Sequence, residues 1–262
     1  THPFSSAQHP TDSRITTRID LKDPLSNILT VLHEAGHALY EMGLDPKWFG
    51  TPRGEAISLG FHESQSRWWE TRIGLSKAFW EGFAPVLHKQ GILKGVSPEK
   101  MYTYINFIQP SFIRVEADEM TYPLHVILRF EIEKALIEGK LKPKDVPEKW
   151  NALMKELLGI TPPTDTQGCL QDVHWSIGAM GYFPTYLIGN LIAAHLFETF
   201  EKAHPDWEKR VKKLDFAFIT EWLKKNIHTH GRKYSTFDLV KKISGKPFAS
   251  DAFVRYLKGK YL

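Results

Sequence analysis

The stretch HEAGH at residues 33–37 decides the fold that we expect for this chain. On an α-helix, residues four positions apart lie one turn apart on the same face, so His33 and His37 can offer two imidazole nitrogens to one metal ion. Glu34 follows His33 directly and is close enough to act as a general base toward a water molecule at that ion. The pattern therefore predicts a metal centre that activates water. The simpler alternative is a surface helix that carries two histidines and a glutamate by chance.

The residues around this motif favour a long, buried helix. Asp23 followed by Pro24 is typical of an N-cap and a first helical position. Apolar residues then recur at helical spacing as far as Gly43, which is a helix stop signal. Gly36 has no side chain and suits the close approach of another element. We therefore expect a helix from Pro24 to Gly43 that holds the motif near its centre.

Composition and charge describe a soluble globular protein, with 42% apolar and 24% charged residues among 262. We expect one catalytic domain over residues 1–262. The net charge of +4 is small for a nucleic-acid-binding protein, and no apolar run approaches the ~18 residues of a membrane span. The single cysteine, Cys169, cannot form an internal disulfide, which fits a reducing compartment. We therefore expect a cytoplasmic protein with neither nucleic acid nor membrane as a partner.

The rest of the sequence predicts a mainly α chain with a small β element near the N-terminus. Residues 1–13 are rich in Pro, Ser and His and predict a loop, whereas residues 15–21 alternate apolar and polar side chains and predict one half-buried strand. Three amphipathic helices are expected after residue 200. Earlier helical patterns cover residues 58–90, 113–139, 145–159 and 187–200.

Glu63 is the residue that we expect to complete the metal centre. A zinc ion in a hydrolase usually takes three protein ligands, and an antiparallel neighbouring helix can bring a carboxylate under the metal from its first turns. Glu63 opens the next predicted helix and fits that position. Glu55 and Glu70 are the other carboxylates nearby, whereas Glu41 would point past the metal and His62 would point elsewhere.

Six stretches of the chain together resemble the M32 family of metallocarboxypeptidases, the Taq/Pfu carboxypeptidase type. In chain order they are HPF at 2–4, DSRIT at 12–16, HEAGH at 33–37, HESQ at 62–65, IRVEAD at 113–118 and GCLQDVHW at 168–175. The resemblance implies a zincin-like (gluzincin) helical fold. It also implies a bound zinc ion, which cobalt can replace in such a site.

The same resemblance implies a role for each residue of the metal centre. His33, His37 and Glu63 are implied as the zinc ligands and Glu34 as the general base. The implied reaction is hydrolysis of the last peptide bond, which releases single amino acids from a peptide substrate with a free C-terminal carboxylate. The physical chemistry of the motif agrees with this, because zinc lowers the pKa of water and a neighbouring carboxylate can take the proton.

Two aromatic side chains are candidates for stabilising the oxyanion. His174, within the last motif, and Tyr182 resemble the His and Tyr that fill this role in related gluzincins. Tyr186 is the alternative to Tyr182 and a further candidate for substrate binding. Asp172 is a candidate for orienting a ring. The simpler reading of His174 is a histidine packed beside Trp175.

A carboxypeptidase must also bind the free carboxylate of its substrate, and the two-pronged guanidinium of arginine suits this. Arg114 is our first candidate, with Asp118 as the residue that would hold it in place. Arg14 is the alternative and shares the DSRIT motif with Asp12, also a substrate-binding candidate. The simpler interpretation is that Arg114 only pairs with an acidic residue on its own helix.

One departure from the family concerns length. Members are about twice as long as this chain, with a helical N-terminal half that is absent here, and the chain starts at Thr1 without an initiator Met. We therefore expect the later part of a longer protein, a fragment, or one subunit that needs a separate N-terminal chain. The resemblance also implies a tendency to form homodimers. A gluzincin endopeptidase or dipeptidase is the alternative activity.

Overall fold

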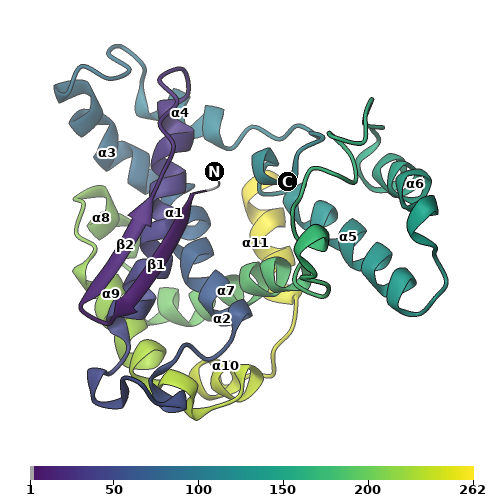
Figure 1. Cartoon of the computed structure of the whole chain (residues 1–262). Coiled ribbons are helices and arrows are strands. Elements are labelled where there is room, and N and C mark those ends of the chain that lie inside the picture. Colours follow the sequence, from purple (N-terminus) through teal and green to yellow (C-terminus); the bar gives the residue numbers. More distant parts are fainter. Residues whose placement is uncertain (1–2) are drawn as a thin grey trace. The chain divides into compact units, whose positions relative to one another are not determined.

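The computed structural model describes residues 3–262 (Figure 1), which form one two-stranded antiparallel sheet and a series of helices. The strands and α-helices are β1 (Phe4–His9), β2 (Asp12–Thr16), α1 (Pro24–Gly43), α2 (Leu59–Arg67), α3 (Lys77–Lys89), α4 (Pro98–Ile105), α5 (Tyr122–Ile137), α6 (Val146–Leu158), α7 (Pro184–Ala203), α8 (Trp207–Lys212), α9 (Ala217–Asn226), α10 (Thr236–Ser244) and α11 (Asp251–Tyr261). The shorter segments are η1 (Pro46–Trp48), η2 (Pro52–Gly54), the π-helical η3 (Trp68–Gly74), η4 (Arg114–Glu116), η5 (Pro143–Asp145), η6 (Trp175–Ile177) and η7 (His228–Lys233). The expected mainly α fold with a small N-terminal β element is confirmed. Within residues 3–262, none of the helices is long and apolar enough to cross a membrane.

The chain divides into two compact units. Unit 1 comprises Thr1–Ile105 and Ile188–Leu262, and unit 2 comprises Asn106–Leu187. Each unit has its own buried apolar cluster. The expectation of a single domain over residues 1–262 is not tested by this division and stays a prediction.

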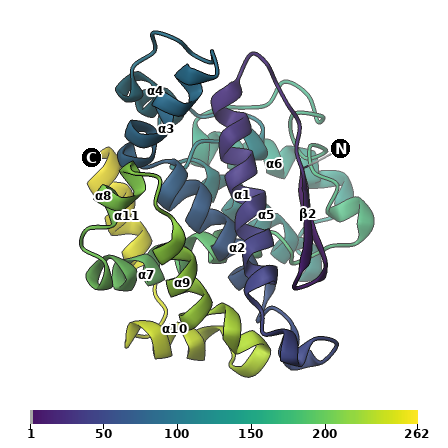
Figure 2. The same cartoon turned by 90° about the vertical axis from the view of Figure 1, so that its left-hand side faces the viewer.

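Helix α1 has the bounds that the sequence predicts. The Asp23 carboxylate accepts a hydrogen bond from the backbone N–H of Ser26 at 3.1 Å, and Pro24 takes the first helical position, where its missing N–H costs nothing. The helix ends at Gly43. Figures 1 and 2 both show the β1–β2 hairpin lying along α1.

Gly36 lets α1 and α2 approach each other backbone to backbone. A Cβ atom added at Gly36 would lie 2.6 Å from the backbone oxygen of Gln65 and 2.6 Å from the Cα atom of Ser66, both on α2. Distances this short are closer than any real side-chain contact. The close approach brings the first turns of α2, and with them Glu63, against the HEAGH turn of α1.

We expect the substitution Gly36→Ala to destabilise the chain by about 1–3 kcal/mol, because the added methyl group forces the two backbones apart. Gly259→Ala is the matched control, since an added Cβ there meets nothing within 4 Å. Urea denaturation of both variants checks this. A Gly36→Ala variant as stable as the Gly259→Ala variant would show that the helices do not need this contact.

Unit 1 fixes the metal helix through a large aromatic core. Trp68 of η3 is fully buried and packs against Phe197 and Phe200 of α7, with ring centroids 4.8 and 5.4 Å apart. Its ring also stacks on that of Trp222 of α9 at 5.6 Å. Fully burying side chains of this size stabilises a fold by roughly 1.5–3 kcal/mol each. The segment that follows α2 is therefore anchored on two other helices of the same unit.

Unit 2 is built on the pair α5 and α6. Leu128 and Ile132 of α5 are fully buried against Trp150 and Met154 of α6. The helix over residues 145–159 was predicted, and α6 begins and ends within one residue of those bounds. Gly159, with a positive φ of 74°, ends it.

The N-terminal β element differs from the sequence prediction. Residues 4–9 form a strand where a loop was expected, and β2 ends at Thr16 where a strand to residue 21 was expected. The hairpin pairs Phe4 with Thr16 and His9 with Asp12, so the ladder ends at Thr16. The backbone N–H and C=O of Asp20 bond instead to the Asn27 side chain of α1, at 3.0 and 2.7 Å. Ile19 and Leu21 are accordingly exposed, at 76% and 90%.

Two predicted helices are shorter in the structure. The pattern over 58–90 is divided into α2, η3 and α3, because the Ser76 hydroxyl accepts a hydrogen bond from the backbone of Phe79 and starts a new helix. The helix predicted from residue 113 begins only at Tyr122. There the Asp118 carboxylate accepts hydrogen bonds from the backbone N–H groups of Met120 and Thr121. In both places a side chain that bonds to the nearby backbone therefore interrupts the helix that the apolar periodicity predicts: Ser76 as an N-cap, and Asp118 in the turn before α5.

Candidate active site

The predicted metal ligands come together in unit 1. Helix α1 presents His33 and His37 one turn apart, and α2 supplies Glu63. The Glu63 Oε2 atom lies 3.5 Å from His37 Nε2 and 4.0 Å from His33 Nε2, and the three ligand atoms all lie within 4.8 Å of one another. Ligands about 2.0–2.2 Å from a tetrahedral metal lie about 3.4 Å apart. The donor set and its spacing therefore fit a zinc-type metal ion.

A carboxylate orients the ring of His33. Its Nδ1 atom lies 2.7 Å from Glu70 Oε2, and the same carboxylate accepts a hydrogen bond from Arg67 Nη1 at 2.7 Å. Arg67 is itself held by Asn190 at 2.7 Å. Metal-binding histidines commonly donate their second N–H to a carboxylate in this way, which fixes the tautomer and leaves Nε2 for the metal. Glu70 therefore belongs to the metal centre as a positioning residue for His33.

A second chain of hydrogen bonds orients His37. Its Nδ1 atom lies 2.6 Å from His62 Nδ1, and His62 Nε2 lies 2.7 Å from Glu41 Oε1. The Glu41 carboxylate can only accept, so His62 Nε2 carries a proton and, in its neutral form, His62 Nδ1 accepts from His37. His37 Nε2 is then left as a lone pair that faces Glu63. As predicted, Glu41 points past the metal position, and it holds His62 instead.

Burial and neighbouring charges shift the pKa values of the three ligand side chains. Burial opposes a charge on His33, but the carboxylates of Glu63 and Glu70 outweigh it and raise the pKa of His33 to about 9. Burial and the charge of His33 lower the pKa of His37 to about 2. Burial raises the pKa of Glu63. The two carboxylates thus favour a positive charge at this position, which is the charge that a metal cation would supply.

Glu34 lies on the same helix as the two histidines and is 3% exposed. A carboxylate kept out of bulk solvent next to a metal position suits a general base. Glu55, an alternative third ligand, is exposed and forms an ion pair with Arg232 at 2.8 Å. It is not part of the cluster.

Arg14 and Asp12 lie on β2, two residues apart and therefore on one face of the strand. Arg14 Nε and Nη2 donate to the two oxygens of Asp12, each at 2.9 Å. The Arg14 side chain is 76% exposed. Hydrogen bonding to Arg14 lowers the pKa of Asp12. The pair is thus an exposed, bidentate one at the hairpin. His2 of the HPF motif lies outside the described residues.

Unit 2 holds Arg114 in a buried cluster of charges. Asp172 Oδ1 accepts from Arg114 Nη2 at 2.7 Å and Nε at 3.2 Å, and Asp172 Oδ2 accepts from Arg129 Nε at 2.7 Å. Burial opposes the charge of Asp172, but Arg129 and Arg114 lower its pKa. Asp118, which was expected to hold Arg114, instead bonds to the backbone N–H and the hydroxyl of Thr121, just before α5, so that expectation is wrong.

His174 pairs with Tyr186. Its Nε2 atom lies 2.9 Å from the Tyr186 hydroxyl, whereas the Tyr182 ring packs against His174 with centroids 5.4 Å apart. Asp172 Oδ1 is 3.9 Å from His174 Nδ1, too far for a hydrogen bond. The alternative tyrosine is therefore the one hydrogen-bonded to His174, and Asp172 orients arginines rather than this ring.

Buried His125 should make the stability of unit 2 sensitive to acid. It is fully buried on α5, and burial with the charges of Arg129 and Arg114 lowers its pKa to about 3. The unfolded chain takes up this proton near pH 6.5, so folding is fully stabilised above that pH and loses about 1.4 kcal/mol per pH unit between 6.5 and about 3. Hydrogen exchange of the α5 amides at pH 7 and pH 5 measures this. The His125→Gln variant should show a flatter pH dependence, and an unchanged slope would contradict the assignment.

Sequence reasoning missed three supporting residues: Glu70 as the partner of His33, His62 as the partner of His37, and Arg129 as the second partner of Asp172. Glu70 follows Glu63 by seven residues, two helical turns along the same face, and that spacing was a usable signal. Arg129 is a charged residue among apolar ones in the pattern of α5, which signals a buried ion pair.

A histidine pair on a buried HExxH helix, with a glutamate from the next helix, defines the gluzincin class of metallopeptidase sites. The family model described as carboxypeptidase Taq (M32) metallopeptidase matches residues 1–261, and the chain belongs to this family. The resemblance stated from the six motifs is thereby confirmed.

The chain is similar to named carboxypeptidases. It is 45% identical over its full length to thermostable carboxypeptidase 1 of Pyrococcus furiosus, covering 52% of that protein. Over 99% of its length it is 44% identical to thermostable carboxypeptidase 1 of Thermus thermophilus, covering 51% of it. The solved structure of the Pyrococcus furiosus carboxypeptidase matches with a TM-score of 0.95 and 45% identity over 100% of this chain and 53% of that one. The chain therefore spans about half the length of the relatives it matches.

Proposed function

We propose that this chain carries the catalytic centre of a zinc-dependent carboxypeptidase that releases single amino acids from the C-terminus of peptides. The observation that carries the proposal is the convergence of His33, His37 and Glu63 within 4.8 Å, beside the buried Glu34. Membership of the M32 family and the names of the relatives support the same reaction. The lone free Cys169 supports a cytoplasmic location.

When bound at these three residues, zinc or cobalt would supply a Lewis acid that polarises the peptide carbonyl and acidifies water. Glu34 then takes the proton of the attacking water and passes it to the departing amine. Glu70 keeps the His33 ring in place, and His62 does so for His37. We further assign His174, with Tyr182 or its hydrogen-bonded partner Tyr186, to the oxyanion.

We assign the substrate carboxylate to Arg114. Its Nε and one Nη2 proton are engaged by Asp172, and Nη1 donates to the Tyr122 hydroxyl at 3.2 Å, which leaves two of its five protons for a carboxylate. The aromatic rings of Tyr186 and Phe183 lie 4.7 and 5.5 Å from the guanidinium carbon and hold it in one orientation. Arg14, with Asp12, is the alternative clamp.

We expect a blocked dipeptide with a free C-terminal carboxylate to be cleaved at least about tenfold faster than its C-terminal amide, because a charge-assisted hydrogen bond contributes about 1.5–3 kcal/mol. Release of free amino acid from the acid, and of the amino acid amide from its counterpart, measures the two rates. Arg114→Lys should reduce the ratio of the acid rate to the amide rate, and Arg14→Lys should leave this ratio unchanged. Equal cleavage of acid and amide would favour the endopeptidase alternative.

A second candidate is one subunit of a larger assembly, with a homodimer as one form of it. The observation that favours it is the exposure of Ile19 and Leu21 beside the β hairpin, in a chain half as long as its relatives. Light scattering combined with the peptide assay tests it. An active monomer in solution would rule it out, and activity that appears only on addition of a separate N-terminal chain would support it.

A further inference from the structure

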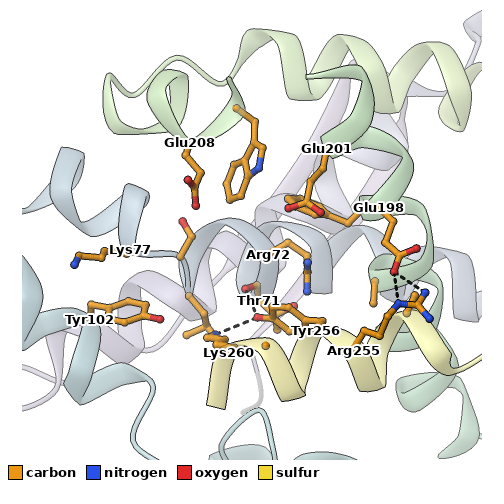
Figure 3. Close-up of a pocket in the computed structure, with 17 residues that line it drawn as sticks. Thr71, Arg72, Lys77, Tyr102, Glu198, Glu201, Glu208, Arg255, Tyr256 and Lys260 are labelled. Atoms are coloured by element: carbon orange, nitrogen blue, oxygen red, sulfur yellow. Dashed lines mark hydrogen bonds and ion pairs between the residues drawn. The ribbon is translucent and has the colours of Figure 1, made fainter. Parts of the chain in front are cut away.

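Unit 1 contains a cavity that is separate from the metal centre, since none of the residues of that centre lines it. It has a volume of about 460 Å³ and is bounded by η3, α7, α8 and α11 (Figure 3). A space of this size holds a small organic molecule rather than a few water molecules. The lining residues that matter here are Arg72, Phe197, Glu201, Trp207, Tyr256 and Lys260.

Arg72 is held firmly in this cavity but is not satisfied. Its guanidinium carbon lies 3.4 Å from the centre of the Tyr256 ring and 4.5 Å from that of Phe197. Aromatic faces attract the cation but do not replace hydrogen-bond acceptors for its N–H groups. Nε and Nη1 of Arg72 are buried and have no hydrogen-bond partner within residues 3–262. A guanidinium in this state is a receptor for a carboxylate or phosphate oxygen.

Carboxylates face the same space. Figure 3 shows Glu201 and Glu208 pointing into the cavity from the wall opposite α11. Burial raises the pKa of Glu201, while the charge of Arg72 and a hydrogen bond from the Trp207 side chain lower it. Arg72 and Glu201 thus act on each other through their charges without forming one of the ion pairs found among residues 3–262.

Two of the three other cations that line the cavity have polar partners, and the third is Lys77. Arg255 forms an ion pair with Glu198 at 2.7 Å, and Lys260 Nζ lies 3.1 Å from the Tyr256 hydroxyl. Among these cations, Arg72 is the one with buried N–H groups that lack a hydrogen-bond partner within residues 3–262, and its charge acts on Glu201. A ligand that satisfies both must carry a carboxylate and an ammonium group.

We propose that this cavity binds a free α-amino acid, with its carboxylate on Arg72 and its ammonium group on Glu201. Phosphate or a simple carboxylic acid would pair with Arg72 but would offer no cation to Glu201. A simple amine would pair with Glu201 but would offer no acceptor to Arg72. The rings of Phe197 and Trp207 offer apolar surface to an aliphatic side chain. The proposal rests on these contacts and does not require peptidase activity.

The test uses the full chain with the substitution Glu34→Gln, so that no hydrolysis interferes. The indole N–H resonance of Trp207, assigned by comparison with Trp207→Phe, reports on the cavity while L-leucine is added up to its solubility limit. We expect a saturable shift. The analogues 4-methylpentanoate, which lacks the ammonium group, and 3-methylbutylamine, which lacks the carboxylate, should bind at least about tenfold more weakly.

Two variants separate the two ends of the ligand. Arg72→Gln should weaken L-leucine binding at least about tenfold. Arg53→Gln should leave it unchanged, because it removes a guanidinium stacked on Trp48 at 4.0 Å, outside the cavity. Glu201→Gln should weaken the binding of L-leucine, which has an ammonium group, but not that of 4-methylpentanoate, which lacks one.

The absence of a saturable shift, or equal L-leucine binding by the Arg72→Gln variant, would overturn the proposal. Binding of 4-methylpentanoate as tight as that of L-leucine would also overturn it, since the cavity would then be a plain carboxylate site. None of these results bears on the peptide assay, so the two proposals fail independently.

Discussion

Replacing Glu34 with Gln should abolish peptide hydrolysis while metal binding persists. Gln has the same shape as Glu but cannot take a proton from water, and loss of a general base costs about 10²–10⁴-fold in rate. The three ligand atoms belong to His33, His37 and Glu63, and the two histidine rings are oriented by Glu70 and His62. Release of free amino acid from a blocked dipeptide gives the rate, and elemental analysis of the purified variant gives the metal content.

Glu55→Gln is the matched control for this substitution. Glu55 is an exposed glutamate of the same unit, paired with Arg232, and lies outside the ligand cluster. We expect its activity to stay within about twofold of the unsubstituted chain, since an exposed ion pair contributes little. A Glu34→Gln variant with the activity of this control would contradict the assigned mechanism.

Asp172→Asn should destabilise unit 2 by about 3–5 kcal/mol, because two buried arginines would lose the carboxylate that they share. Arg129 is fully buried and Arg114 is 4% exposed, so neither guanidinium can be solvated in place of the lost charge. Burial and the charge of Arg114 already lower the pKa of Arg129 to about 10 in the presence of Asp172. Hydrogen exchange of the α5 and α6 amides, which form the core of unit 2, measures the change.

Asp118→Asn is the natural comparison for this effect. Asp118 lies in the same unit and accepts hydrogen bonds from the backbone N–H groups of Met120 and Thr121 in the turn before α5, which asparagine can also accept. The Asp118→Asn substitution should therefore lower the stability of unit 2 by less than about 1 kcal/mol. If the two variants were equally stable, the arginine–aspartate cluster would not be what holds unit 2 together.

The sequence predicted those parts of the fold whose causes are local. Helix α1 has its own N-cap at Asp23 and its own stop at Gly43, so its bounds required nothing from the rest of the chain. The β hairpin was misplaced because a strand depends on its partner, and the partner strand lay in a stretch rich in Pro and Ser. The start of α5 was misplaced because Asp118 holds a turn at residues 118–121 inside an apolar pattern that continues on both sides of it.

The candidate site divides in the same way. His33 and His37 lie on one helix, so their spacing was sufficient, and Glu63 followed from the geometry of two adjacent helices. Glu70 was weighed only as a metal ligand, because its role beside His33 depends on how α1 packs against η3. The partner of Arg114 was predicted on the same segment, yet Asp172 comes from a position 58 residues later. Contacts between distant segments need the folded structure.

Anomalous X-ray scattering at the zinc edge, from crystals grown with zinc, tests the central claim most directly. We expect one strong peak in unit 1, about 2.0–2.2 Å from His33 Nε2, His37 Nε2 and a Glu63 carboxylate oxygen. A chain saturated with zinc that shows no peak between these three residues, or shows its main peak elsewhere, would contradict the claim that the HEAGH helix holds the metal.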